Sequence, residues 1–171
     1  MLHVLAMMSV FAGCAFIGVR ASSALRLRKD TLRAMADALH RLSMWMDYTA
    51  QPLRALARKA KTEETAAFFD AFAKYLKTDE DVPSAWKRAM EDARSNDAGF
   101  ASLHEAELNI LEEYAGTLGG SDRETQAKNA ALAQRRLEAV LKEAEEIYAS
   151  KGRMYRSVGI LSGIAVAILL W

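Results

Sequence analysis

Residues that could carry catalysis or bind a metal are few and widely separated in this sequence. His3, His40 and His104 each lack a second histidine or a carboxylate at the spacing with which a metalloprotease helix binds zinc. The acidic run Asp79–Asp81 has no further ligands nearby, so a solvated loop explains it better than a metal site. No nucleophile is paired with a base. The sequence therefore predicts a protein that is not an enzyme and that holds neither a metal nor a cofactor.

The glycine-rich stretch from Gly116 to Asp122 precedes a predicted helix. Backbone amides at the start of a helix can hold a phosphate, but this stretch lacks the lysine and the spacing of a nucleotide-binding P-loop. Glycine commonly ends a helix, and serine or aspartate commonly caps the next one. We interpret the stretch as a helix stop followed by an N-cap, and we expect no small-molecule substrate.

Nucleic-acid binding is not expected either. The net charge is only +1, so the chain as a whole does not attract a polyanion. The aromatic residues with helical spacing are better explained as core than as a platform for stacked bases; they are Phe68, Phe69, Phe72 and Tyr75.

Both ends of the chain lack charged residues. Residues 1–19 and 157–171 contain no Lys, Arg, Asp or Glu. As helices these runs would extend about 28 Å and 22 Å, against a bilayer hydrocarbon thickness of about 30 Å. Tyr155 and Trp171 suit a membrane interface, Arg156 can extend to it, and local thinning of the bilayer can accommodate the shorter run. We expect transmembrane helices at 1–19 and 157–171.

Basic residues flank both apolar runs on the side of the charged middle: Arg20, Arg26, Arg28 and Lys29 after the first, and Lys151, Arg153 and Arg156 before the second. The positive-inside rule then places residues 20–156 in the cytoplasm and both termini across the membrane. These flanks would also lie well against anionic lipid headgroups.

An exported, lipid-anchored protein is the alternative. Phe11 to Cys14 has the look of a lipoprotein cleavage site, which would make Cys14 the anchor and place the helices outside the cell. Phe is a poor fit at the first position, no Lys or Arg precedes the site, and the apolar run continues to Val19. Cys14 is the only cysteine, so the chain forms no internal disulfide, which fits a reducing cytoplasm.

The charged middle, residues 20–156, is long enough for one domain. Ala, Leu, Lys, Arg and Glu dominate it and β-branched residues are sparse, so we predict an all-α fold: a compact bundle of about six helices. The first helix, over 22–50, carries apolar residues spaced by three, four or seven positions: Leu25, Leu32, Met35, Leu39, Leu42 and Met46.

The other helices have recognisable starts. A turn is predicted over residues 96–99, and the sixth helix has no strong break before Gly152, so it is expected to continue into the C-terminal apolar run. The predicted starts are Pro52, Thr62 and Asp81 for the second to fourth helices, and the capping-box pairs Ser102–Glu105 and Ser121–Glu124 for the fifth and sixth.

Small residues recur every four positions in the second apolar run, at Gly159, Gly163 and Ala167. Such a face lets membrane helices approach closely. The first run offers Ser9, Gly13 and Gly18 for the same purpose. We therefore predict helix packing through Gly159, Gly163 and Ala167.

Several motifs in order resemble the stage III sporulation protein AB family over essentially the whole chain. They are Leu118–Asp122 followed by Gln126 and Lys128, the run Lys151–Gly159, Tyr48 with Pro52 and Leu53, and Ala85 with Trp86. One position departs from the family pattern: Trp45 stands where the family often has a glutamate, so no role of that acid is carried over.

The resemblance implies a cytoplasmic bundle similar to the F-type platform protein of type II secretion systems. It also implies a channel-like complex at the membrane between mother cell and forespore, with a secretion-type ATPase and other sporulation channel components as partners. We therefore expect a non-enzymatic, membrane-anchored assembly component with a partner interface at Gly119, Ser121, Asp122 and Gln126. The rivals are the exported or lipid-anchored helical protein and a membrane-bound enzyme that uses a carboxylate or histidine.

Overall fold

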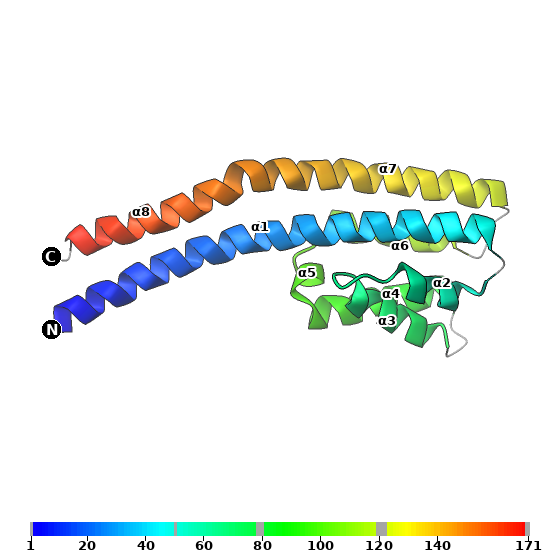
Figure 1. Ribbon diagram of the computed structural model, residues 1–171, viewed down its shortest axis with the longest axis horizontal. Helices are drawn as coiled ribbons and strands as arrows, with labels where there is room; N and C mark the ends of the chain where they lie inside the picture. Colours follow the sequence, from blue (N-terminus) through cyan, green and yellow to red (C-terminus); the bar gives the residue numbers. More distant parts are fainter. Residues whose placement is uncertain (1, 50, 78–80, 119–122, 170–171) are drawn as a thin grey trace. The chain divides into compact units, whose positions relative to one another are not determined.

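The computed structural model describes residues 2–49, 51–77, 81–118 and 123–169, which form helices without any strand (Figure 1). The prediction of an all-α fold is confirmed. In chain order the helices are α1 (Leu2–Tyr48), α2 (Leu53–Ala60), α3 (Ala66–Tyr75), α4 (Val82–Asn96), α5 (Ala98–Ala101), α6 (Glu105–Thr117), α7 (Arg123–Ile147), η1 (Tyr148–Gly152) and α8 (Arg153–Leu169).

The chain divides into two compact units. Unit 1 comprises Met1–Lys29 and Glu143–Trp171, and unit 2 comprises Asp30–Lys142. Helices α1 and α7 contribute residues to both units, whereas α2 to α6 belong to unit 2 and η1 and α8 to unit 1. Over the described residues, none of the helices combines the length and the apolar character needed to cross a membrane.

Helix α1 is longer than the sequence predicted. The apolar run and the charged stripe after it form one continuous helix that begins at Leu2, so the predicted separate start near Ser22 is wrong. No proline interrupts this segment. The helix ends where both the amide and the hydroxyl of Thr49 donate to the carbonyl of Trp45, at 2.9 and 2.8 Å, just before Pro52.

The expected continuation of the sixth predicted helix into the C-terminal run is confirmed. Helices α7, η1 and α8 follow one another without a break. The intervening turn, η1, is a π-helix, in which each amide bonds to the carbonyl five residues earlier. Sequence patterns gave no sign of this wider turn.

An aromatic cluster forms the core of unit 2. Phe68 lies at its centre, with ring centroids 4.6 Å from Trp86 and 5.9 Å from Phe100. Trp86 also contacts Phe72 at 5.0 Å and Tyr114 at 5.8 Å. All five rings are fully buried, and each favourable pair adds about 0.5–1.5 kcal/mol beyond the area that it buries. Helices α3, α4, α5 and α6 are thus joined through ring contacts.

The predicted stripe on α1 completes this core, since its buried members are Leu32, Met35, Leu39 and Leu42. A short helix, α5, replaces the turn predicted over 96–99, so the described residues of the bundle form seven helices where six were predicted. The Asp97 carboxylate caps this helix by accepting from the amide of Phe100 at 3.0 Å. Gly99 is required there, because a Cβ would lie 2.3 Å from the buried Thr31 hydroxyl of α1.

Two predicted helix starts differ from those observed. The capping box at Ser102 and Glu105 is wrong: Ser102 ends α5, and its hydroxyl donates to the carbonyl of Gly99 at 2.6 Å. Helix α6 begins at Glu105 instead, and the buried Glu107 carboxylate accepts from the amide of His104 at 2.6 Å. The second pair, Ser121–Glu124, includes a residue outside those described.

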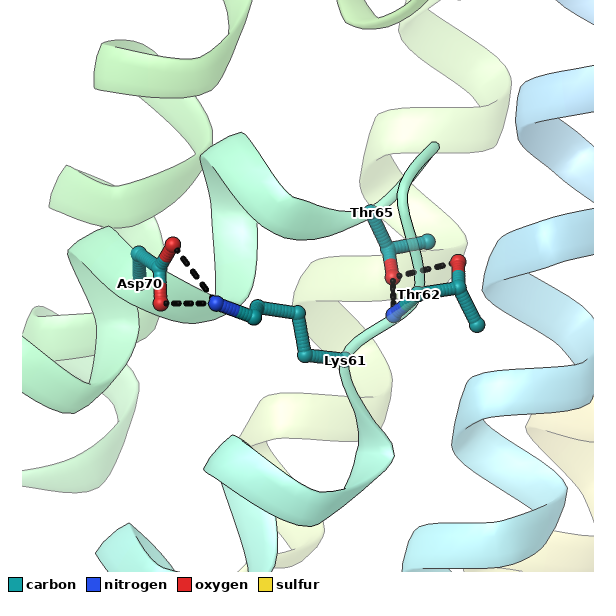
Figure 2. A network of polar contacts seen from close by, with 4 residues as sticks. All are labelled: Lys61, Thr62, Thr65 and Asp70. Atoms are coloured by element: carbon teal, nitrogen blue, oxygen red, sulfur yellow. Dashed lines mark hydrogen bonds and ion pairs between the residues drawn. The ribbon is translucent and has the colours of Figure 1, made fainter.

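The third predicted helix begins later than Thr62. Figure 2 shows Thr65, just before α3, accepting from the amide of Thr62 at 3.0 Å while the two hydroxyls lie 3.1 Å apart. Thr65 is fully buried, so these bonds satisfy a hydroxyl that water does not reach. Beside it, Lys61 donates to both carboxylate oxygens of Asp70 at 3.1 Å, which ties the α2–α3 turn to α3 (Figure 2).

The predicted N-cap of α4 is confirmed. The Asp81 carboxylate accepts from the amide of Ser84 at 3.2 Å, and Pro83 lies in the first turn. Hydrogen bonds from Ser84, chiefly from its side chain and also from its backbone, lower the pKa of the Asp81 carboxyl.

A second bond joins the C-terminal end of α3 to α4. Tyr75, the last residue of α3, donates to Asp92 of α4 at 2.5 Å, and this bond raises the pKa of the Tyr75 hydroxyl.

The first prediction concerns Trp86, whose indole Nε1 is buried without a hydrogen-bond partner among the described residues. Trp86→Ala should lower the free energy of unfolding by about 3–5 kcal/mol, because it leaves a cavity beside three rings. Trp86→Phe should lower it much less, because it keeps ring contacts and removes an N–H that forms no bond. Urea unfolding of the full chain in detergent, followed by circular dichroism, measures both; equal losses would contradict this role.

Candidate functional site

Of the four residues predicted to form the partner interface, the structure describes one. Gly119, Ser121 and Asp122 lie outside the described residues. Gln126, in the first turns of α7, lines a groove of about 250 Å³ in unit 2. Thr117 and Leu118, which precede the predicted loop, line the same groove. The groove is therefore the candidate functional site of unit 2.

Three helices form its walls. Helix α1 contributes four residues, the end of α6 and the residue after it contribute three, and α7 contributes five, three of which are alanines. The lining residues are His40, Ser43, Met44 and Met46; Tyr114, Thr117 and Leu118; and Gln126, Ala127, Ala130, Ala131 and Gln134. The alanines are too short to fill the space between the helices, and the space remains as a groove.

The first part of α7 is only lightly packed. From residue 124 to residue 132 none of its side chains is buried, and the first buried ones are Ala133 and Leu137. Arg136 and Glu113 form an ion pair that joins α7 to α6 beyond the groove. Burial provides most of the stability of a protein helix, so this end of α7 gains little stability from packing.

One chain of hydrogen bonds joins the three walls. The Gln134 amide nitrogen donates to the Ser43 hydroxyl at 3.2 Å, and that hydroxyl lies 3.0 Å from the hydroxyl of Tyr114. The Tyr114 ring also packs against Trp86, so the floor of the groove is continuous with the aromatic core. A change in the groove is thereby coupled to the packing of the bundle.

The lining offers neutral hydrogen-bonding groups and apolar surface, without any Lys, Arg, Asp or Glu. Methionine side chains adapt to many shapes, and amides and hydroxyls can both donate and accept. Tyr114 and Gln134, the hydrogen-bond partners of Ser43 described above, are not groups that activate a serine as a nucleophile. Among the described residues, no group of three or more His, Cys, Asp or Glu side chains could hold a metal ion.

Unit 1 contains the second predicted feature, the small-residue face. Gly159 is buried against α1, where a Cβ built on Gly18 would lie 2.7 Å from the carbonyl oxygen of Tyr155 and 3.0 Å from Cα of Gly159. The two backbones therefore touch at this point. The side-chain positions of Gly163 and Ala167 lie outside the described ones, so their predicted packing stays a prediction.

The contact between α1 and the C-terminal helices extends through the π-turn. Gly152 is buried, and a Cβ there would lie 2.9 Å from the Tyr148 ring and 3.6 Å from the hydroxyl of Ser22. Lys29 lies over the Tyr148 ring at 4.9 Å from its centre. Sequence reasoning missed this contact; the only signal was a glycine inside a charged segment.

Comparisons with known proteins all identify one family, and the sequence matches extend over nearly the whole chain. The sequence model for "Stage III sporulation protein AB (spore_III_AB)" matches residues 3–171. Stage III sporulation protein AB of Bacillus subtilis (strain 168) is 26% identical over 174 residues, which cover 99% of each chain. A solved structure of a stage III sporulation protein AB is 25% identical, with a TM-score of 0.62 over 71% of this chain and 96% of the other. On these matches, the protein belongs to the stage III sporulation protein AB family.

Proposed function

We propose that this protein is a non-enzymatic, membrane-anchored assembly component of a complex required for endospore formation. The observation that carries the proposal is the exposed apolar surface of unit 1. Its large exposed side chains include Phe16, Ile17 and Val19 of α1, and Met154, Val158, Leu161, Ile164 and Ile168 of α8. Apolar patches of this kind mark membrane or partner contacts, and here they lie next to or within the charge-free runs.

Membership of a sporulation protein family is the basis for the proposed kind of complex. What the sequence motifs implied, a cytoplasmic bundle similar to the F-type protein of secretion platforms, is part of this proposal, as is a channel-like complex on the mother-cell side of the outer forespore membrane. A secretion-type ATPase and other sporulation channel components are the proposed partners. The groove beside Gln126 is the proposed docking position, because it combines unfilled apolar space with neutral amide and hydroxyl groups in its lining.

The size of the groove suits one anchoring side chain of a partner rather than a cofactor. Ligand pockets for small molecules usually measure about 300–1,000 Å³, whereas this groove measures about 250 Å³. Interfaces commonly depend on a few large side chains seated in such hollows. The partner would be recognised by shape and neutral hydrogen bonds, since the groove lining carries no formal charge.

The second prediction tests the topology. Alkaline phosphatase fused after Gly120 should be inactive and a fluorescent protein at the same position should be bright, because the basic flanks hold the bundle in the cytoplasm. Enzyme assays and fluorescence of intact cells measure the two fusions. An active phosphatase would favour the exported or lipid-anchored alternative and would refute the proposed orientation.

The third prediction tests the groove. Ala131→Leu should fill it and reduce the recovery of sporulation partners with the protein by about tenfold, which corresponds to about 1.4 kcal/mol. Ala139→Leu is the matched control, because Ala139 is exposed on the same helix and does not line the groove. Co-purification from detergent-solubilised sporulating cells, together with spore yield, measures both. Equal recovery from the two variants would remove the groove from the interface.

The fourth prediction tests the contact between α1 and α8. Gly18→Ala should lower the thermal unfolding midpoint of the full chain in detergent, because the added Cβ meets backbone atoms that cannot turn away. Gly13→Ala should not, because a Cβ there has nothing within 4 Å. Circular dichroism on heating measures both changes. Identical midpoints for the two variants would show that the backbone contact contributes nothing to stability.

A further inference from the structure

The structure divides the charge of the chain unevenly between its units. Unit 1 contains seven Lys and Arg against three Asp and Glu, and unit 2 contains 16 against 19. A chain with a net charge of only +1 thus consists of a unit at +4 and a unit at −3. The sequence as a whole hides this separation, because the basic residues of unit 1 come from two segments far apart in the chain.

Contacts between α1 and the C-terminal helices bring those two segments together. Gly18 lies against Tyr155 and Gly159, Ser22 lies beside Gly152, and Lys29 lies over Tyr148. From one contact to the next the residue numbers rise on α1 and fall on the C-terminal helices, so the two segments are antiparallel. Residues 20–29 therefore lie alongside residues 148–156 (Figure 1). Neither segment contains an acidic residue.

Residues 20–29 and 148–156 carry five exposed cations, and four of them define the collar of unit 1: Arg20 on α1, Lys151 on η1, and Arg153 and Arg156 on α8. The stretch from residue 20 to residue 29 is about 14 Å long as a helix. Several positive charges are therefore concentrated on one short length of the helix pair. Such a concentration attracts anionic groups and weakens as salt is added.

Exposed apolar side chains adjoin the collar. Ile17 and Val19 precede Arg20 on α1, and Val158 and Leu161 follow Arg156 on α8. The guanidinium of Arg20 lies 5.6 Å from the centre of the Phe16 ring, so this side chain bridges the apolar and the charged parts. Only a surface that is apolar inside and anionic at its rim complements both parts at once.

We propose that the collar binds the headgroups of anionic phospholipids, so that the α1–α8 pair selects anionic lipid rather than any bilayer. This inference rests on the proposed membrane anchoring and adds a lipid preference to it. The net negative charge of unit 2 repels anionic lipids, so the charge of the chain favours their contact with the collar and opposes their contact with the bundle. Each cation near an anionic surface contributes roughly fivefold in affinity.

The test uses the full chain in neutral detergent, titrated with short-chain phosphatidylglycerol or phosphatidylcholine, with bound lipid counted by native mass spectrometry. The wild type should bind phosphatidylglycerol more tightly, and added salt should weaken this binding. Replacing Arg20, Arg153 and Arg156 by Gln should lower the affinity by roughly fivefold per removed charge. The control replaces three exposed cations of unit 2 by Gln, namely Arg58, Lys59 and Arg135, and should retain wild-type affinity.

Equal affinity for the two lipids, or equal losses in the two triple variants, would overturn the lipid preference. Competition by free glycerol phosphate as strong as that by the lipid would also overturn it, by showing that a soluble anion suffices. Flotation with phosphatidylcholine vesicles separates this from the proposed function. If the protein floats with these vesicles but shows no lipid preference, the proposed membrane anchoring stands and the lipid preference is refuted. If it floats with no vesicle, both proposals are refuted. Circular dichroism verifies the fold of each variant.

Discussion

The packing of Trp86 against Phe68, Phe72 and Tyr114 is the interaction on which unit 2 depends. These rings come from three short helices, and none of the three would be stable alone in water. The cluster also reaches the groove through Tyr114. The Tyr114 hydroxyl lies within hydrogen-bond distance of the Ser43 hydroxyl, which in turn accepts from the Gln134 amide. The geometry of the candidate site therefore depends on the packing of the core. A partner that occupies the groove would contact residues that are connected to the aromatic cluster through Tyr114.

Unit 1 depends on a different constraint, namely the absence of a side chain at Gly18. Because the backbones of α1 and α8 touch there, the two ends of the chain form one helix pair. Three consequences follow from this pairing. The small-residue face predicted for helix packing is used, at least at Gly159, within the chain itself. The basic flanks of the two apolar runs come together as one collar. Finally, the π-turn at Tyr148–Gly152 lies in the same contact, where it brings the Tyr148 ring over a buried glycine and beneath Lys29.

Helix boundaries show where local sequence rules were insufficient. Asp81 followed by Pro83 predicted the start of α4 correctly, because the cap and its amide partner are three residues apart and need no other part of the chain. Ser102 and Glu105 fit a capping box equally well, yet Ser102 ends α5, and α6 has His104 as its N-cap with Glu107 accepting from the His104 amide. The difference is tertiary: Phe100 must enter the aromatic cluster, and Gly99 must approach Thr31, so the chain forms an additional helical turn before α6 begins.

The sequence by itself determined the helical class, the buried stripe of α1, the burial of Phe68, Phe69 and Phe72, and the uncharged character of the two ends. Each of these depends on composition or on spacing within one helix, which a linear pattern records directly. Family membership was likewise predictable, since its motifs are local and ordered along the chain. Only the tertiary structure decided that Gln126 lines a groove with His40 and Tyr114, that Gly18 is the glycine which α8 approaches, and that the basic flanks converge. Those features join residues separated by tens of positions or more, and their distances depend on how helices pack, which spacing along one chain does not encode.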